Sequence, residues 1–185
     1  MKILKFILLL SISYSAYANE NVAANKRLGL GLSYTALFGN LRDYFKDGVS
    51  YNINGLWEIP KLWEGLYIGS SVDYAPLKGD DIRESTSLRL YSISLGLDKE
   101  FFKISWYSLF ISLRPEITYW TVRNHLGRNY ASSDKGNFRS LLVGLTNSFN
   151  ISSLFEVEFF IFSHIPEIHL TNVYFDLGLR IAKNF

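Results

Sequence analysis

Residues 171–185 read TNVYFDLGLRIAKNF, and this stretch decides the fold. Its odd-numbered side chains are apolar from Val173 to Ile181. The even-numbered positions between them include Asp176 and Arg180. A side-chain period of two predicts a β-strand with one apolar face and one polar face. The alternation therefore predicts a strand, and the strand ends on an aromatic residue, Phe185.

The same stretch resembles the C-terminal signal of bacterial outer-membrane β-barrels, a closing strand that is apolar at alternate positions and ends in Phe. The resemblance implies a barrel architecture and an address in the bacterial cell outer membrane. It also implies a partner, the barrel-assembly machinery, which would recognise the strand that ends at Phe185.

The N-terminus has the features of a secretory signal peptide. Lys2 and Lys5 precede a short apolar run, residues 3–12, and Ala16-Tyr17-Ala18 is a small-x-small cleavage pattern. We expect residues 1–18 to be a signal peptide and residues 19–185 to be one outer-membrane domain. The apolar run is shorter than the roughly 20 residues of a helical membrane span. The chain has no Cys, so neither a lipid-anchored cysteine nor a disulfide is available.

The charge balance of the chain gives no sign of a nucleic-acid partner. Without Lys2 and Lys5 the chain carries 17 basic and 17 acidic residues, so nothing indicates a nucleic-acid partner. Aromatic residues make up 16% of the sequence, which suits rings placed at two membrane interfaces. The alternative at this point is an aromatic-rich soluble β-sandwich.

Alternating segments recur along the whole chain, and we expect an all-β fold, an eight-stranded antiparallel transmembrane β-barrel. The longer connections would lie on one side and the short turns on the other, and the sheet must close because lipid satisfies no backbone groups. Pro115 is expected to distort its strand. Residues 101–107 are either an interfacial segment or an early start of the fifth strand. The expected strands lie near 28–38, 49–59, 66–74, 91–97, 109–120, 140–149, 154–164 and 171–185, with longer connections at 39–48, 75–85, 123–137 and between the last two strands.

The predicted inward face carries many charges. Eight strands leave an interior that side chains just fill, whereas porins with an aqueous channel have about 16–18 strands. Because buried charges are costly unless paired, we expect Arg114 and Arg180 to bridge to inward carboxylates and to plug the barrel without a diffusion pore. The charged residues on this face are Glu58, Asp73, Arg114, Glu116, Glu156, Glu158, Asp176 and Arg180.

His164 and Asp176 form the sharpest candidate for chemistry. If the last two strands cross the membrane as 154–164 and 176–185, these two residues face each other, both inward and near the outer rim. A carboxylate that orients a His suits a general base. A tighter hairpin around Pro166 and Glu167 would instead separate them.

At these residues the chain resembles the PagL family of lipid A 3-O-deacylases, eight-stranded barrels with a His-x-Ser-Asn motif on the penultimate strand and an acidic residue on the last. The resemblance implies catalytic roles for His164 and Asp176. Pro166 occupies the place of the nucleophilic Ser, and Ser163 has the parity of a lipid-facing residue.

The spacing of His164, Glu167 and His169 offers ligand types that zinc accepts, but Pro166 interrupts the alternation and the spacing does not predict convergence. We predict no metal site and no cofactor.

The sequence favours a small, non-enzymatic barrel that resembles the OmpA transmembrane domain, OmpX and the opacity proteins. Its role would be structural or surface interaction through the longer loops, with lipopolysaccharide or an unknown surface partner. One alternative is a divergent PagL-like deacylase that uses His164 and Asp176. A second is a small apolar-ligand transporter whose pocket would be lined by Phe110, Trp120, Phe160 and Phe162.

Overall fold

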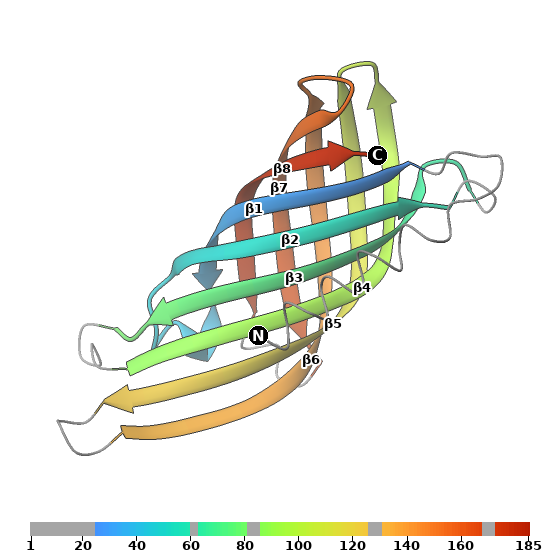
Figure 1. Ribbon diagram of the computed structural model, residues 1–185. Helices are drawn as coiled ribbons and strands as arrows, with labels where there is room; N and C mark the ends of the chain where they lie inside the picture. Colours follow the sequence, from blue (N-terminus) through green and yellow to red (C-terminus); the bar gives the residue numbers. More distant parts are fainter. Residues whose placement is uncertain (1–24, 60–62, 81–85, 126–130, 168–172) are drawn as a thin grey trace.

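The chain folds into one closed antiparallel barrel of eight strands in sequence order, with β1 pairing β8 (Figure 1). The computed structural model describes residues 25–185 apart from 60–62, 81–85, 126–130 and 168–172. The predicted signal peptide, residues 1–18, lies outside the described residues. The elements are β1 (Lys26–Leu37), the short 3-10 helix η1 (Gly39–Leu41), β2 (Gly48–Glu58), β3 (Leu66–Lys78), β4 (Thr86–Ile104), β5 (Tyr107–His125), β6 (Ala131–Asn150), β7 (Phe155–Pro166) and β8 (Tyr174–Asn184).

Because the side chains alternate with a period of two, the barrel has two different surfaces. On β1, Leu30 is 61% exposed on the outside of the barrel, whereas Thr35 is completely buried inside it. The same alternation continues around the barrel, so the exterior is an apolar belt and the interior is polar. The predicted fold class is therefore confirmed. Within the described residues, no helix is long and apolar enough to cross a membrane.

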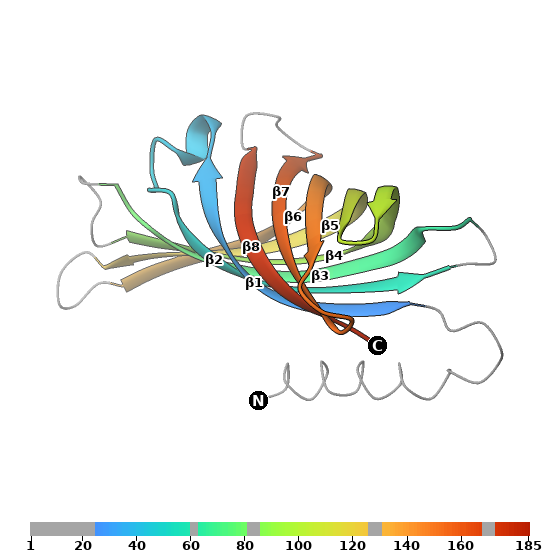
Figure 2. The ribbon, with the colours of Figure 1, turned by 90° about the horizontal axis from the view of Figure 1, so that it is seen from above.

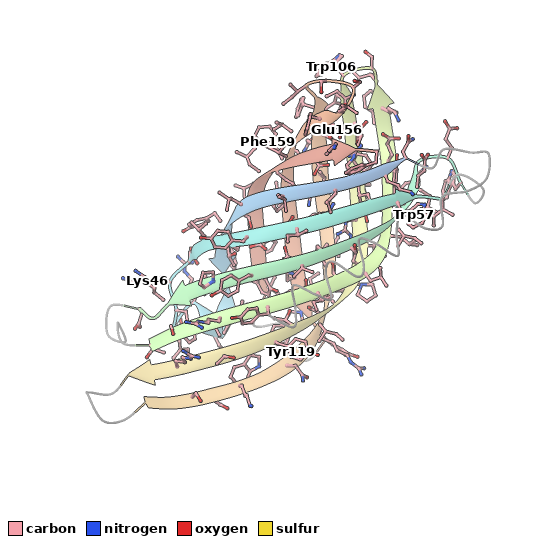
Figure 3. The ribbon with its side chains drawn as sticks, viewed as in Figure 1. Lys46, Trp57, Trp106, Tyr119, Glu156 and Phe159 are labelled. Atoms are coloured by element: carbon pink, nitrogen blue, oxygen red, sulfur yellow. The ribbon has the colours of Figure 1, made fainter. Side chains whose placement is uncertain are left out.

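Aromatic side chains ring the exterior near both ends. Tyr74 stacks against Tyr51 and Tyr91 from the two neighbouring strands, with ring centroids 6.2 and 4.8 Å apart. At the end with the short turns, Trp106 and Phe149 stack at 6.1 Å. Figure 3 shows Trp106 at the β4–β5 turn, and Tyr119 and Phe159 pointing away from the barrel. These positions agree with rings placed at two membrane interfaces.

Two of the predicted connections were too long. β3 continues to Lys78, β5 continues to His125 and β6 already begins at Ala131, so most of 123–137 is strand. The polar composition suggested loops because these strands continue beyond the apolar belt. Their inward faces still alternate, and they bury an apolar cap over the outer mouth of the barrel. The apolar cap comprises Leu37, Phe45, Ala75, Leu77, Leu88, Leu90 and Tyr174, with Leu41, Trp120, Val122 and Phe138 packed against it.

The ambiguous segment 101–107 belongs mainly to β4, which runs to Ile104 before the chain turns into Tyr107. A register shift lies between Glu100 and Phe102. Pro115 causes no such shift, but the regular pairing of β4 with β5 lapses around it, between Ser94↔Glu116 and Leu97↔Leu113. The distortion follows from the missing N–H of proline.

Candidate functional site

The barrel interior is filled by ion pairs, as the inward charges predicted. Arg114 is 1% exposed, and its Nε and Nη2 donate to Oδ2 and Oδ1 of Asp98 over 2.9 and 2.7 Å. Its Nη1 donates to Asn54 over 2.7 Å. Asp98 was not among the predicted inward charges, because the expected strand ended at residue 97 and the turn was expected after Asp98. Its even number places it on the inward face of β4, and this parity was the signal that could have found it.

A second group of pairs lies toward the end with the short turns. Arg180 contacts Glu158 and donates from Nη1 to Asn52 over 2.9 Å, as an inward arginine was expected to do. Arg27 reaches Glu156 and Glu158 at 3.0 and 3.1 Å. We call these residues, together with Arg114 and Asp98, the interior plug. Glu156, labelled in Figure 3, is one of its buried members.

Two paired glycines make room for the interior plug. Gly69 on β3 lies opposite Gly96 on β4. A Cβ on Gly69 would overlap Oδ2 of Asp98 and lie 2.6 Å from Nε of Arg114. A Cβ on Gly96 would lie 2.6 Å from Cα of Arg114. The sequence thus keeps both positions without side chains where a guanidinium crosses the barrel.

We expect Gly69→Ala to lower the free energy of unfolding by about 3 kcal/mol, because the added methyl must displace a buried, bidentate ion pair. Urea unfolding in detergent micelles, followed by gel mobility without heating, measures the change. Gly55→Ala is the matched control, since the nearest atom to its Cβ is Oγ of Ser70 at 3.3 Å. Equal stability of the two variants would contradict this role of Gly69.

His164 lies in the centre of a second polar cluster, beneath the apolar cap. It is 0% exposed, and its Nδ1 lies 2.9 Å from each carboxylate oxygen of Glu116. Its Nε2 lies 3.3 Å from Oδ2 of Asp176, within ion-pair distance but outside hydrogen-bond geometry. Tyr174 stacks on the imidazole at 4.1 Å with an interplanar angle of 7°. These four residues form the His164 cluster.

Hydroxyl groups donate further hydrogen bonds to the carboxylates of Glu116 and Asp176. Glu116 accepts hydrogen bonds from Ser140 at 2.6 Å and Thr118 at 3.1 Å, and Asp176 accepts one from Thr35 at 2.5 Å. With these hydroxyl groups, the His164 cluster links the consecutive strands β5, β6, β7, β8 and β1. Glu116 is the partner that the sequence did not predict, because its contact with His164 depends on the register of β5 and β7 on the two sides of β6.

The predicted register of the last hairpin was wrong by two residues. His164 pairs with Tyr174, and Asp176 pairs with Phe162. A shift by two preserves parity, so His164 and Asp176 both still point inward and meet diagonally. His164 and Asp176 therefore lie close together, as predicted, although the hairpin that joins their strands is tighter than expected.

The geometry of the His164 cluster leaves the imidazole no free edge. Each ring nitrogen faces a carboxylate, and no hydroxyl is hydrogen-bonded to His164 among the described residues. Ser163 lies on the opposite face of β7. Glu167 is exposed while His164 is buried, so these two do not converge, and His169 lies outside the described residues. Within the described part of the chain, no group of three or more His, Asp or Glu is placed to hold a metal ion.

The four rings proposed for an apolar-ligand pocket lie in three different places. Phe110 packs with Leu56 and Tyr67, and Phe160 packs with Phe162 and Leu142. Trp120 packs against the apolar cap. The structure therefore does not gather them around one cavity.

A feature that the sequence did not indicate lies outside the barrel mouth. β6 pairs with β5 along residues 131–149 but with β7 only from Ser140 onward. In the part of the chain described, no strand pairs with the other edge of residues 131–138. The outer ends of β4, β5 and β6 stand apart from those of β7 and β8 in both views (Figures 1 and 2). We call this edge the free edge of β6.

Comparison with known proteins agrees with this architecture. No family model matches the sequence, and no curated protein matches it. The structure is similar to a major outer membrane protein of Thermus thermophilus, with a TM-score of 0.64 and 11% identity over 89% of this chain and 100% of that one. It is also similar to Neisserial surface protein A, with a TM-score of 0.62 and 16% identity over 86% and 97%. For Ail, the attachment invasion locus protein of Yersinia pestis, the TM-score is 0.58 with 13% identity over 89% and 100%.

The closed sheet, the apolar belt and the paired polar interior define the class. The chain is a small eight-stranded β-barrel of the bacterial outer-membrane type. Its interior is filled by paired side chains, and its sheet continues beyond the barrel mouth.

Proposed function

We propose that this protein is a non-enzymatic barrel of the outer membrane that binds an extended segment of a partner polypeptide at the cell surface. The observation that carries the proposal is the free edge of β6. An unpaired edge presents a row of backbone donors and acceptors, and an added strand satisfies them. The opposite side of the sheet is occupied, because Lys46 N donates to the carbonyl of Lys78 and Phe45 bridges to Gly79.

The backbone direction identifies which residues offer these groups. The carbonyl of Arg139 accepts a hydrogen bond from the N–H of Glu167, on the β7 side of β6. In an antiparallel ladder every second residue directs both backbone groups to the same side. Ser133 and Asn137 therefore direct their N–H and C=O groups to the free edge of β6, whereas Asp134 directs its own to β5. Lys135 offers its C=O to this edge, while its N–H donates to Oδ1 of Asp134 over 2.8 Å.

The names of two similar structures are consistent with a surface role. One is called a surface protein and the other an attachment invasion locus protein. A filled interior supports the same conclusion, because the interior plug and the apolar cap oppose passage of solutes along the barrel axis.

Proline substitution tests the free edge of β6. We expect Ser133→Pro and Asn137→Pro to weaken binding of edge-pairing peptides by about five- to tenfold each, because each removes one outward donor. Short peptides are selected by phage display against the protein in nanodiscs, and their affinities are then measured on each variant. Ser133→Ala and Asn137→Ala keep the N–H and are the matched controls.

Peptides that bind both proline variants as tightly as the alanine variants would remove the support for strand addition. Unheated gel mobility verifies that each variant is a folded barrel before binding is measured.

The deacylase alternative receives no support from the His164 cluster, since a general base needs one ring nitrogen directed at a nucleophile. Expression in an outer membrane with fully acylated lipid A tests this directly by mass spectrometry of the lipid. We expect an unchanged spectrum. Loss of one acyl chain that disappears with His164→Ala would overturn the non-enzymatic assignment.

A further inference from the structure

The outer surface of the barrel carries a groove that crosses β4, β5, β6 and β7. It has a volume of about 820 Å³ and runs between two rows of outward side chains. One wall follows the paired residues Ile93, Ile117 and Arg139, and continues to Glu167. The other wall consists of Leu95, Pro115, Leu141 and Ile165. Three interstrand spacings make the groove about 14 Å long.

The groove is apolar along most of both walls and charged where one wall reaches β6 and β7. Arg139 is exposed where the groove reaches β6, and within the described residues no carboxylate pairs with it. Glu167 lies beside it, joined through the hydrogen bond from its backbone N–H to the Arg139 carbonyl. An apolar channel with an exposed cation in its wall matches a molecule with an acyl chain and an anionic head.

The surface beyond Arg139 is cationic. Four further basic residues occupy outward positions beyond the last apolar or tyrosine residue of their strands: Lys78 on β3, Arg89 on β4, Arg123 on β5 and Lys135 on β6. By register, Arg89 and Lys135 both flank Thr121. Among the outward positions of these strand ends that the structure describes, none is Asp or Glu. Asp134 lies on the opposite face of β6.

A second hollow on the exterior provides an internal comparison. It holds about 1000 Å³ between β7, β8, β1 and β2, and its outward walls include Leu30, Val157 and Leu179. Its one charged residue, Arg180, points inward and is held by Glu158. Of these two apolar hollows, the one that contains Arg139 has an exposed cation in its wall and the other does not.

We propose that the groove binds an acyl chain of a phosphorylated glycolipid of the outer leaflet, the lipid A part of lipopolysaccharide, and that Arg139 binds its phosphate. Arginine presents paired donors that match a phosphate, and each basic residue near a membrane surface strengthens the binding of anionic lipid. Arg89, Arg123 and Lys135 form a second cationic site for the anionic groups of the lipid, farther from the apolar belt. The proposal does not depend on the free edge of β6.

Native mass spectrometry of the folded protein tests the proposal, with bis-phosphorylated lipid A as the probe and its dephosphorylated form as the comparison. We expect Arg139→Gln to weaken lipid A binding roughly fivefold and Glu167→Gln to strengthen it. Lys103→Gln is the matched control, because Lys103 is an exposed cation at the other end of the barrel, where it pairs with Glu100 at 3.4 Å.

The groove itself is tested by filling it. Ile117→Trp is expected to reduce lipid A binding at least fivefold, whereas Leu179→Trp, in the second hollow, leaves it unchanged. Equal binding of the phosphorylated and dephosphorylated lipids, or an equal effect of the two tryptophans, would overturn the proposal. These residues all lie on the exterior, and unheated gel mobility verifies folding of each variant.

Discussion

Replacing His164 by leucine is expected to lower the free energy of unfolding by about 3–5 kcal/mol, because it leaves two buried carboxylates without the group that separates them. Glu116 keeps its hydroxyl donors, but the nearest side chain on β7 no longer offers a donor. Asp176 keeps Thr35. Urea unfolding in detergent micelles, followed by gel mobility without heating, measures the loss.

Two further variants show whether charge is the cause. Glu116→Gln placed on the leucine background removes one of the two carboxylates, and we expect it to recover part of the lost stability. Ser163→Ala changes the neighbouring residue on the outward face, and we expect an effect within about 0.5 kcal/mol. A leucine variant as stable as wild type would show that the His164 cluster contributes nothing to folding.

Arg114→Met is the second large effect, expected at about 3–5 kcal/mol, because Asp98 would remain buried as an unpaired carboxylate. Asp98 is 1% exposed, and the two groups share two hydrogen bonds. The remaining donor to Asp98 is the hydroxyl of Ser112. The same unfolding measurement applies, with wild type and each single variant compared at the same detergent concentration.

The double variant Arg114→Met with Asp98→Leu gives the sharper outcome. An apolar pair of similar volume often replaces a buried ion pair with little loss, so we expect the double variant to be more stable than Arg114→Met alone. Additive losses would contradict the ion pair as the source of the effect. Recovery in the double variant would also show that the interior plug contributes little net stability over an apolar filling.

Several features of the site followed from parity alone. The positions of Arg114, Arg180 and Glu158 on alternating segments predicted their inward direction, and the cost of burying a charge predicted their pairing. The partner of each arginine was harder to predict. Glu158 meets Arg180 across neighbouring strands, whereas Asn52 meets Arg180 past Gly31 of the intervening strand β1. Only a closed sheet, in which β1 pairs with β8 in a fixed register, sets that contact.

Other features of the fold and of the surface did not follow from the sequence pattern. Residues 123–137 are polar, and this polarity alone suggested a loop. Trp120, Val122 and Phe138, which flank the segment, occupy even-numbered positions and pack inward against the apolar cap, as residues of a continuing strand do. The free edge of β6 had no signal in the sequence, because it depends on where β7 stops. The groove at Arg139 likewise depends on four strands and their register.

The sequence by itself determined the strand type, the inward or outward direction of each side chain and the closed barrel, because these follow from a local period of two and from the cost of unpaired backbone in lipid. The tertiary structure alone decided the register of the last hairpin and the contact of His164 with Glu116. It also decided the length of the sheet beyond the barrel mouth. These depend on how strands far apart in the chain are staggered around the barrel, and a change of register by two residues leaves the local pattern unchanged.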